Sequence, residues 1–199
     1  KCRSCDKRIS IRYPLVELTT GFIFGVIGGI GDVGVIGEYR AWLNDFTLPF
    51  FLGIAALLVA ITMVDLEQMI IPDSFVVAGV VAAALALFFA PSPILFQNLF
   101  WAILGSIFLL FLNFITRGQG MGLGDVKLIF LLGLVVGDKL PWAFFVAVLS
   151  GAVVGLLLIA IGKAKLRQPI PFGPFLVLGA LAAIFFGEKF TVIFNHYAF

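Results

Sequence analysis

Residues 46–64 read FTLPFFLGIAALLVAITMV, carry no charged side chain and are followed directly by Asp65. At a rise of about 1.5 Å per helical residue, a run of this length spans the ~30 Å hydrocarbon core of a bilayer. Its apolar residues are continuous and do not alternate with polar ones, as they would in a strand of a membrane barrel. The stretch therefore predicts a transmembrane helix with a carboxylate at its end.

The composition of the whole chain agrees with a membrane environment. Of its 199 residues, 62% are hydrophobic and 12% are charged, whereas soluble domains are about 45–50% apolar and about 25% charged. The first run is joined by six more, bounded by charges, prolines or glycines: 13–30, 75–90, 94–115, 128–136, 142–161 and 172–186. The short run 128–136 is expected to extend on its N-terminal side or to be tilted. We therefore expect an all-α polytopic membrane protein with about seven transmembrane helices.

Basic residues predict the orientation, because Lys and Arg accumulate on the cytoplasmic side of a membrane. If the N-terminus is cytoplasmic, ten of the thirteen basic residues lie on the inner side, and only Arg40, Lys139 and Lys189 lie outside. The opposite orientation would invert this bias. The acidic residues of the outer segments are expected to be solvated; they are Asp32, Glu38, Asp45, Asp138 and Glu188.

Two carboxylates fall at helix ends on the predicted inner side. Asp65 ends the second apolar helix, and Asp125 opens the fifth within Gly122-Leu123-Gly124-Asp125. A carboxylate at the membrane boundary is costly unless it has a partner or a function. Two carboxyl groups held within a few Å share a proton, so that one activates water while the other donates a hydrogen bond to a scissile carbonyl. Asp65 and Asp125 thus predict an aspartyl protease site.

Other interpretations of these residues are open at this point. Gly122 and Gly124 would let a backbone approach a substrate closely or take a positive φ, but they also suit a flexible loop before a helix-capping aspartate. An ion-coupled transporter could use Asp65 and Asp125 to bind a cation or proton, although both lie at one face and not at the midplane. A third hypothesis is a non-catalytic scaffold. The sequence lacks the His-Glu-x-x-His motif of zinc proteases and a phosphate-binding loop.

Four motifs, in order along the whole chain, resemble the bacterial type IV prepilin peptidases, which are Gly-x-Gly-Asp intramembrane aspartyl proteases. They are the Cys2-x-x-Cys5 pair with the segment 12–17, Asp65 followed by Ile71-Pro72-Asp73, the motif at 122–125, and Pro171-Phe172-Gly173-Pro174. The resemblance implies that Asp65 and Asp125 form the catalytic pair, with Gly122, Gly124 and Asp73 in the supporting loops. An alternative role for Asp73 is to cap the third helix.

The same resemblance implies the reaction and its location. Members remove the short basic leader from prepilins or pseudopilins, next to a hydrophobic helix, on the cytoplasmic side of the bacterial inner membrane. The substrates and the lipid bilayer are therefore the expected partners, and no nucleic acid is expected. The family has about eight membrane helices, so that seven runs fit a chain trimmed before Lys1. Residues 1–12 are then the remnant of a cytoplasmic loop, and residues 13–199 form the transmembrane protease domain.

Cofactors are expected only outside the proteolytic reaction. Many members of the family also methylate the new N-terminus with S-adenosylmethionine, and Glu17 is the residue that we connect with this activity. The alternative for Glu17 is an interfacial carboxylate paired with Arg12. Cys2 and Cys5 are half of a zinc site and would need a second Cys-x-x-Cys pair upstream; without it they are reduced thiols.

Overall fold

The computed structural model describes residues 11–30, 34–118, 121–162 and 170–197, and the regular structure in these ranges is entirely helical. The all-α prediction is confirmed for this part of the chain. A short helix, α2 (Val35–Leu43), and two 3-10 turns, η1 (Asn44–Phe46) and η2 (Gly137–Lys139), accompany the longer helices. The longer helices are α1 (Arg12–Ile30), α3 (Thr47–Gln68), α4 (Asp73–Phe88), α5 (Ser92–Ile115), α6 (Leu123–Val136), α7 (Leu140–Ala160) and α8 (Gly173–Tyr197).

The helices are apolar enough for a membrane protein. Three helical stretches have the length and composition to cross a bilayer: Val35–Gln68, Ser92–Ile115 and Leu123–Ala160. The last of them contains both α6 and α7, which are joined through η2. Shorter apolar helices are Tyr13–Gly29, Asp73–Phe88 and Gly173–Gly187. The count of seven spans and the cytoplasmic N-terminus stay predictions.

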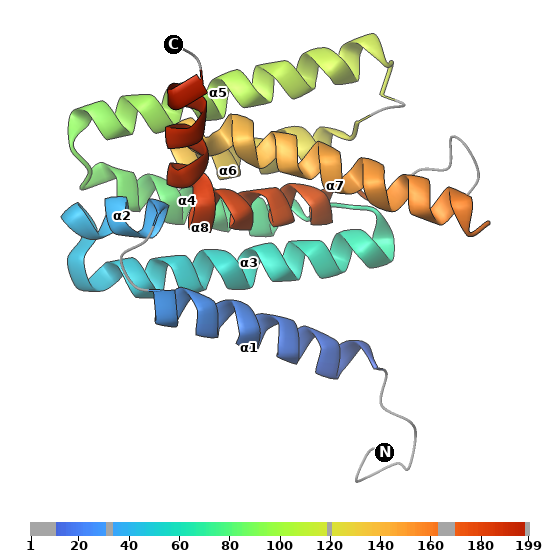
Figure 1. Cartoon of the computed structure of the whole chain (residues 1–199), viewed down its shortest axis with the longest axis horizontal. Coiled ribbons are helices and arrows are strands. Elements are labelled where there is room, and N and C mark those ends of the chain that lie inside the picture. The colour runs from blue at the N-terminus through green and yellow to red at the C-terminus, as the bar shows by residue number, and fades with distance from the viewer. Residues whose placement is uncertain (1–10, 31–33, 119–120, 163–169, 198–199) are drawn as a thin grey trace, which may run out of the picture.

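The long helices lie along the long axis of the molecule and alternate in direction (Figure 1). The ends of α3, α5 and α7 lie at the same end of the bundle as the starts of α4, α6 and α8, on the right in Figure 1. Asp65 lies in the last turn of α3 and Asp125 in the first turn of α6. The alternation therefore brings both aspartates to one end of the bundle.

Helix α6 lies at the centre of the fold. Nine of its residues, from Asp125 to Val136, are buried, and it packs most extensively against α5. A Cβ on Gly133 would run into the backbone of Ala102 in α5. Likewise, a Cβ on Gly179 of α8 would meet the backbone of Ala143 in α7. Small residues thus allow these helix pairs to approach closely, which is how helices pack where lipid removes the hydrophobic driving force.

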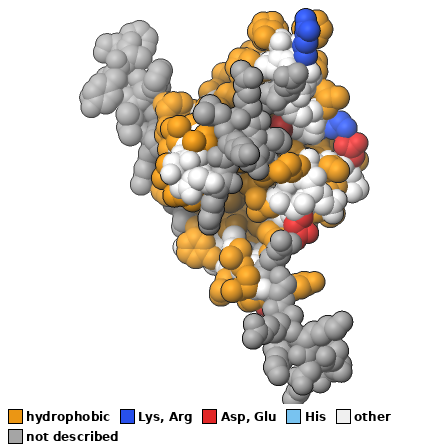
Figure 2. Space-filling model, turned by 90° about the vertical axis from the view of Figure 1, so that its right-hand side faces the viewer, with side chains coloured by type: hydrophobic (Ala, Val, Ile, Leu, Met, Phe, Trp, Pro, Cys, Tyr) orange, Lys and Arg blue, Asp and Glu red, His pale blue; other side chains and the backbone are white. Residues whose placement is uncertain are grey.

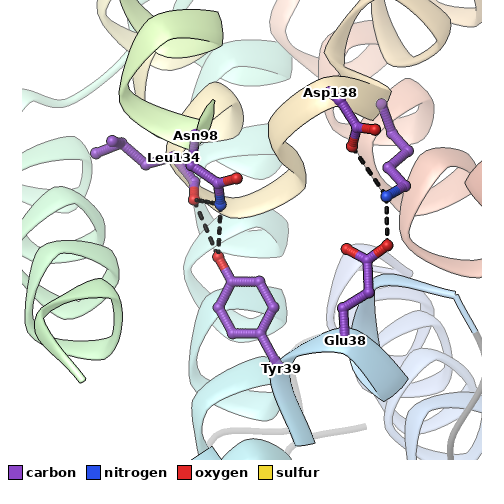
Figure 3. A network of polar contacts seen from close by, with 6 residues as sticks. Glu38, Tyr39, Asn98, Leu134 and Asp138 are labelled. Carbon is purple, nitrogen blue, oxygen red and sulfur yellow. Dashed lines mark hydrogen bonds and ion pairs between the residues drawn. The ribbon is translucent and has the colours of Figure 1, made fainter. Parts of the chain in front are cut away.

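The segment 31–45, which is expected to be an outer loop, contains α2, which packs its buried Val35, Ile36 and Tyr39 against the bundle. Figure 3 shows the hydrogen bonds of its buried Tyr39 hydroxyl. The Tyr39 hydroxyl donates a hydrogen bond to the Leu134 carbonyl at 3.0 Å, and Asn98 Nδ2 donates to the same carbonyl at 2.9 Å. Each hydrogen bond offsets the cost of burying a polar group, so α2 is fastened to α5 and α6.

The buried Lys139 pairs with Glu38 of α2 and with Asp138, at 2.9 Å for the second pair; Figure 3 labels both acidic partners. Glu38 and Asp138 keep some exposed surface, as expected for outer acids, but they also neutralise the charge of Lys139, a residue that is only 6% exposed. The apolar pattern of the sequence contains no sign of this ion-pair cluster, because its members come from segments far apart in the chain.

Candidate active site

Asp65 is placed by the end of α3. The helix ends at Gln68, and Met69 takes a left-handed conformation with φ 54°, donating its N–H to the Asp65 carbonyl at 2.8 Å. This αL cap turns the chain away from the helix. The Asp65 side chain is 4% exposed, and its Oδ2 accepts a hydrogen bond from the backbone N–H of Gly173 at 2.9 Å. The start of α8 therefore holds the first carboxylate of the predicted pair.

Asp125 is placed by the first turn of α6. Its Oδ2 accepts a hydrogen bond from the backbone N–H of Gly122 at 3.1 Å, and the side chain is 8% exposed. An acidic side chain that reaches back to the residue before the helix satisfies a backbone donor there and fixes its own orientation. Gly122 has an extended backbone with φ −78°, so the role expected from a positive φ is not used at this position.

Gly124 lies where the two segments that carry the aspartates contact each other. A Cβ at this position would lie 3.0 Å from Cβ of Ile71 and 3.4 Å from its Cδ1. Ile71 is buried in the short link between α3 and α4. The missing side chain of Gly124 therefore allows the first turn of α6 to press against the segment that follows Asp65.

Both carboxylates line one cavity of about 1310 Å³ at this end of the bundle. Its wall comes from the end of α3 and the α3–α4 link, the loop after α5, the start of α6 and the segment before α8. Figure 2 looks onto this end of the molecule, where charged side chains are few and lie among hydrophobic ones. The predicted pair is thus brought together in a space that a peptide could enter.

Asp73 lines the cavity, and it does not have the helix-capping role that the sequence suggests as an alternative. The residue before α4 is Pro72, and no side chain caps that helix. The Asp73 carboxylate instead accepts two hydrogen bonds from Lys127 Nζ, at 2.7 and 2.9 Å. This ion pair connects the start of α4 with the first turns of α6, close to Asp125.

Glu17 is the one remaining predicted residue that the structure describes. Glu17 is exposed on α1 and does not line the cavity. Cys2 and Cys5 lie outside the described residues, and so does the side chain of His196. Within the described ranges, no group of three or more His, Cys, Asp and Glu residues could hold a metal ion.

The structure also adds residues that the sequence interpretation missed. Gly173 supplies the hydrogen bond to Asp65. In the sequence, its motif Pro171-Phe172-Gly173-Pro174 indicates the family resemblance but not this contact. Lys127 pairs with Asp73. Asn113 Nδ2 donates to the Met121 carbonyl and so ties the glycine-rich loop to the end of α5. An amide side chain at the end of an apolar helix was the signal available for Asn113.

Comparison with protein families gives two matches. Residues 52–156 match the model of the type IV leader peptidase family, and residues 1–28 match that of the bacterial peptidase A24 N-terminal domain. The first match contains Asp65, Asp125 and the loops that carry them. No solved structure matches the chain significantly.

Individual relatives cover nearly the whole chain. A Burkholderia pseudomallei protein is 33% identical over 97% of the chain, a Bacillus subtilis protein is 34% identical over 95%, and a Pseudomonas aeruginosa protein is 32% identical over 100%. Each of these relatives is named a prepilin leader peptidase/N-methyltransferase. The chain spans 60%, 72% and 66% of their lengths, respectively.

Proposed function

The chain belongs to the type IV leader peptidase family, and from this premise we propose that it is an aspartyl endopeptidase that removes the leader from type IV prepilins or pseudopilins. The observation that carries the proposal is the placement of Asp65 and Asp125. They come from different helices, line one cavity and are each held by a backbone N–H. We place this cavity at the cytoplasmic face of the bacterial inner membrane, where the basic residues predict it.

The proposed chemistry needs only these two side chains and water. One carboxyl group is ionised and removes a proton from a water molecule, and the other is protonated and donates a hydrogen bond to the scissile carbonyl. The water oxygen bonds to the carbonyl carbon, the C–N bond of the resulting tetrahedral species breaks, and a proton passes to the leaving amine. The N–H groups of Gly122 and Gly173 keep the carboxylates oriented. Such fixed orientation matters because misplacement by about 1 Å can cost about 10²-fold in rate.

Methyl transfer belongs to the proposal as a second activity, because the names of the relatives include an N-methyltransferase. S-adenosylmethionine would supply the methyl group. Glu17, the residue connected with it, is exposed on α1 and lines neither the aspartate cavity nor the smaller cavity beside it.

The transporter alternative is disfavoured by the position of the carboxylates. Ion-coupled transporters place their coupling residues near the bilayer midplane, within broken helices. Asp65 lies in the last turn of α3 and Asp125 in the first turn of α6, at one end of the bundle. A pair at one end suits a substrate that is cut at the membrane boundary.

One experiment separates the two functions. Purified protein in lipid vesicles is given full-length prepilin, and leader release is followed by mass spectrometry; the same vesicles are tested for ion-driven proton uptake. We expect leader release without uptake. Uptake that depends on Asp65 and Asp125, with no release from any prepilin offered, would overturn the proposal.

A further inference from the structure

An apolar groove lies beside the aspartate cavity. It is lined by Val76, Val77 and Val80 of α4, Val126 and Phe130 of α6, and Ser106 of α5, and its volume is about 400 Å³. This volume is within the range of sites that bind small-molecule ligands in other proteins. We refer to it as the α4–α6 groove.

The groove arises from the packing of three helices. Both α4 and α5 pack against α6, but they make few contacts with each other. Helix α6 therefore forms the floor, where Val126 and Phe130 are one turn apart, and α4 provides a wall of valines. The Ser106 hydroxyl donates a hydrogen bond to the Ala102 carbonyl of its own helix at 2.8 Å. The one hydroxyl group in the groove lining therefore already has an acceptor for its proton.

The groove is continuous with the candidate active site. Asp73 and Lys127 line both spaces, and Val126 directly follows Asp125. From Asp73 to Val80 the wall contains eight residues and extends for roughly 10 Å along the helix. The groove thus starts with an ion pair beside the aspartates and continues as an apolar channel along α4 and α6.

We propose that the α4–α6 groove binds the apolar segment of the substrate that adjoins the scissile bond. The proposal rests on the proposed function. In the proposed reaction the substrate is cut next to a hydrophobic helix at the membrane boundary, so its surroundings change from polar to apolar at that point. The half-exposed ion pair of Asp73 and Lys127 followed by valines and Phe130 presents the same change, from polar to apolar. A substrate whose apolar segment lies in the groove would bury apolar side chains against these residues. This contact would hold the scissile bond at the aspartates.

Val80 and Val81 provide a matched pair for the test. Val80 lines the groove and is half-buried, whereas its neighbour Val81 lies outside the lining and is 52% exposed. A short aliphatic amino acid that carries a diazirine group, and is too small to fill the groove, is placed at either position in the inactive Asp125→Asn protein, in vesicles with full-length prepilin. We expect at least fivefold more adduct from position 80, mapped by mass spectrometry to the apolar segment of the prepilin. Equal adducts from both positions, or adducts with lipid alone at position 80, would overturn the proposal and identify the groove as an acyl-chain site.

A kinetic measurement is independent of the adducts. Val80→Trp fills the groove and is expected to raise KM for full-length prepilin about tenfold or more, while Val81→Trp leaves it unchanged. Thermal unfolding of both variants checks that they fold. If the parent protein releases the leader but Val80→Trp behaves as the parent does and position 80 gives no adduct, the groove assignment is wrong. If the parent releases no leader but position 80 still captures prepilin, the proposed hydrolysis fails and the binding site stands.

Discussion

Gly173 donates its backbone N–H to Asp65 Oδ2 over 2.9 Å, although 108 positions separate them in the sequence. A Cβ on Gly173 would lie only 2.6 Å from that oxygen. Gly173 is the first residue of α8, where backbone N–H groups have no partner within the helix and where the helix dipole favours a negative charge. The glycine therefore both permits the close approach and provides the donor.

Gly173→Ala should lower the rate of leader cleavage by about 10²-fold, because the new methyl group pushes the Asp65 carboxylate out of position. Gly155→Ala is the matched control, since a Cβ at Gly155 would meet only Cδ1 of Ile170, at 3.7 Å. Initial rates on full-length prepilin compare the two variants, and thermal unfolding shows whether either is destabilised. A Gly173→Ala protein with the activity of the parent would mean that this hydrogen bond does not position Asp65.

Asp65→Asn and Asp125→Asn should each reduce leader cleavage by about 10²–10⁴-fold, because an amide has the shape of a carboxyl group but cannot act as a general acid or base. Both variants should still insert into membranes and keep the backbone hydrogen bonds, since the amide oxygen also accepts. Asp45→Asn, on the expected outer side and exposed, is the control and should keep full activity. Substantial turnover by either variant of the pair would remove that residue from the catalytic site.

Much of the fold is predictable from local patterns. The seven apolar runs fall mainly within α1 and α3 to α8, because a long uninterrupted run can satisfy its backbone in lipid only as a helix. Helix α6 begins at Leu123, so the run 128–136 does extend on its N-terminal side. Helix α2 was missed because Glu38 and Arg40 interrupt its apolar residues, and its burial depends on hydrogen bonds to distant helices.

For the candidate site, too, some features are predictable from short sequence motifs, and others depend on contacts between segments far apart in the chain. The motifs that contain Asp65 and Asp125 are visible in the sequence, and their placement at one end follows from the alternation of helices. The contact of Gly124 with Ile71 and that of Gly173 with Asp65 depend on how separate helices pack, which no spacing along one helix encodes. The catalytic roles themselves stay predictions, tested by the variants above.

The loops that contain Asp65–Asp73 and 116–127 should be accessible from the cytoplasm, and the segment 32–45 from the outside. Ten of thirteen basic residues favour this orientation, and the shared cavity requires the first two loops to lie on one side. Single cysteines introduced at Glu67, Arg117 and Asp45 are labelled with a membrane-impermeant reagent in intact cells and in inverted vesicles. Labelling of Glu67→Cys and Arg117→Cys from opposite sides would exclude a catalytic pair.

Methyl transfer and proteolysis should be separable in the full-length protein. Glu17→Gln should weaken methylation of a prepilin that has already been cut more than it weakens cleavage, because Glu17 lies on α1, outside the aspartate cavity. Asp125→Asn should do the reverse. Incorporation of labelled methyl groups and leader release are followed in parallel. Equal loss of both activities in the Glu17 variant would indicate a role in folding or helix placement.

Gly124→Val should impair cleavage strongly, by about 10²-fold, because its side chain must occupy the space of Ile71. A Cβ alone would lie 3.0 Å from Ile71 Cβ, so Gly124→Ala should have a smaller effect, and the two methyl groups of valine should separate α6 from the α3–α4 link.

The identity of the obstructing residue can be tested directly. Ile71→Ala removes Cγ1 and Cδ1, the atoms 3.4 Å from the added Cβ, and should restore part of the activity of Gly124→Val. By itself Ile71→Ala leaves a small cavity and should lower stability by about 2–5 kcal/mol, which thermal unfolding measures. A double variant that is as inactive as Gly124→Val would show that Gly124 serves the substrate or the loop backbone and not the contact between the two aspartate segments.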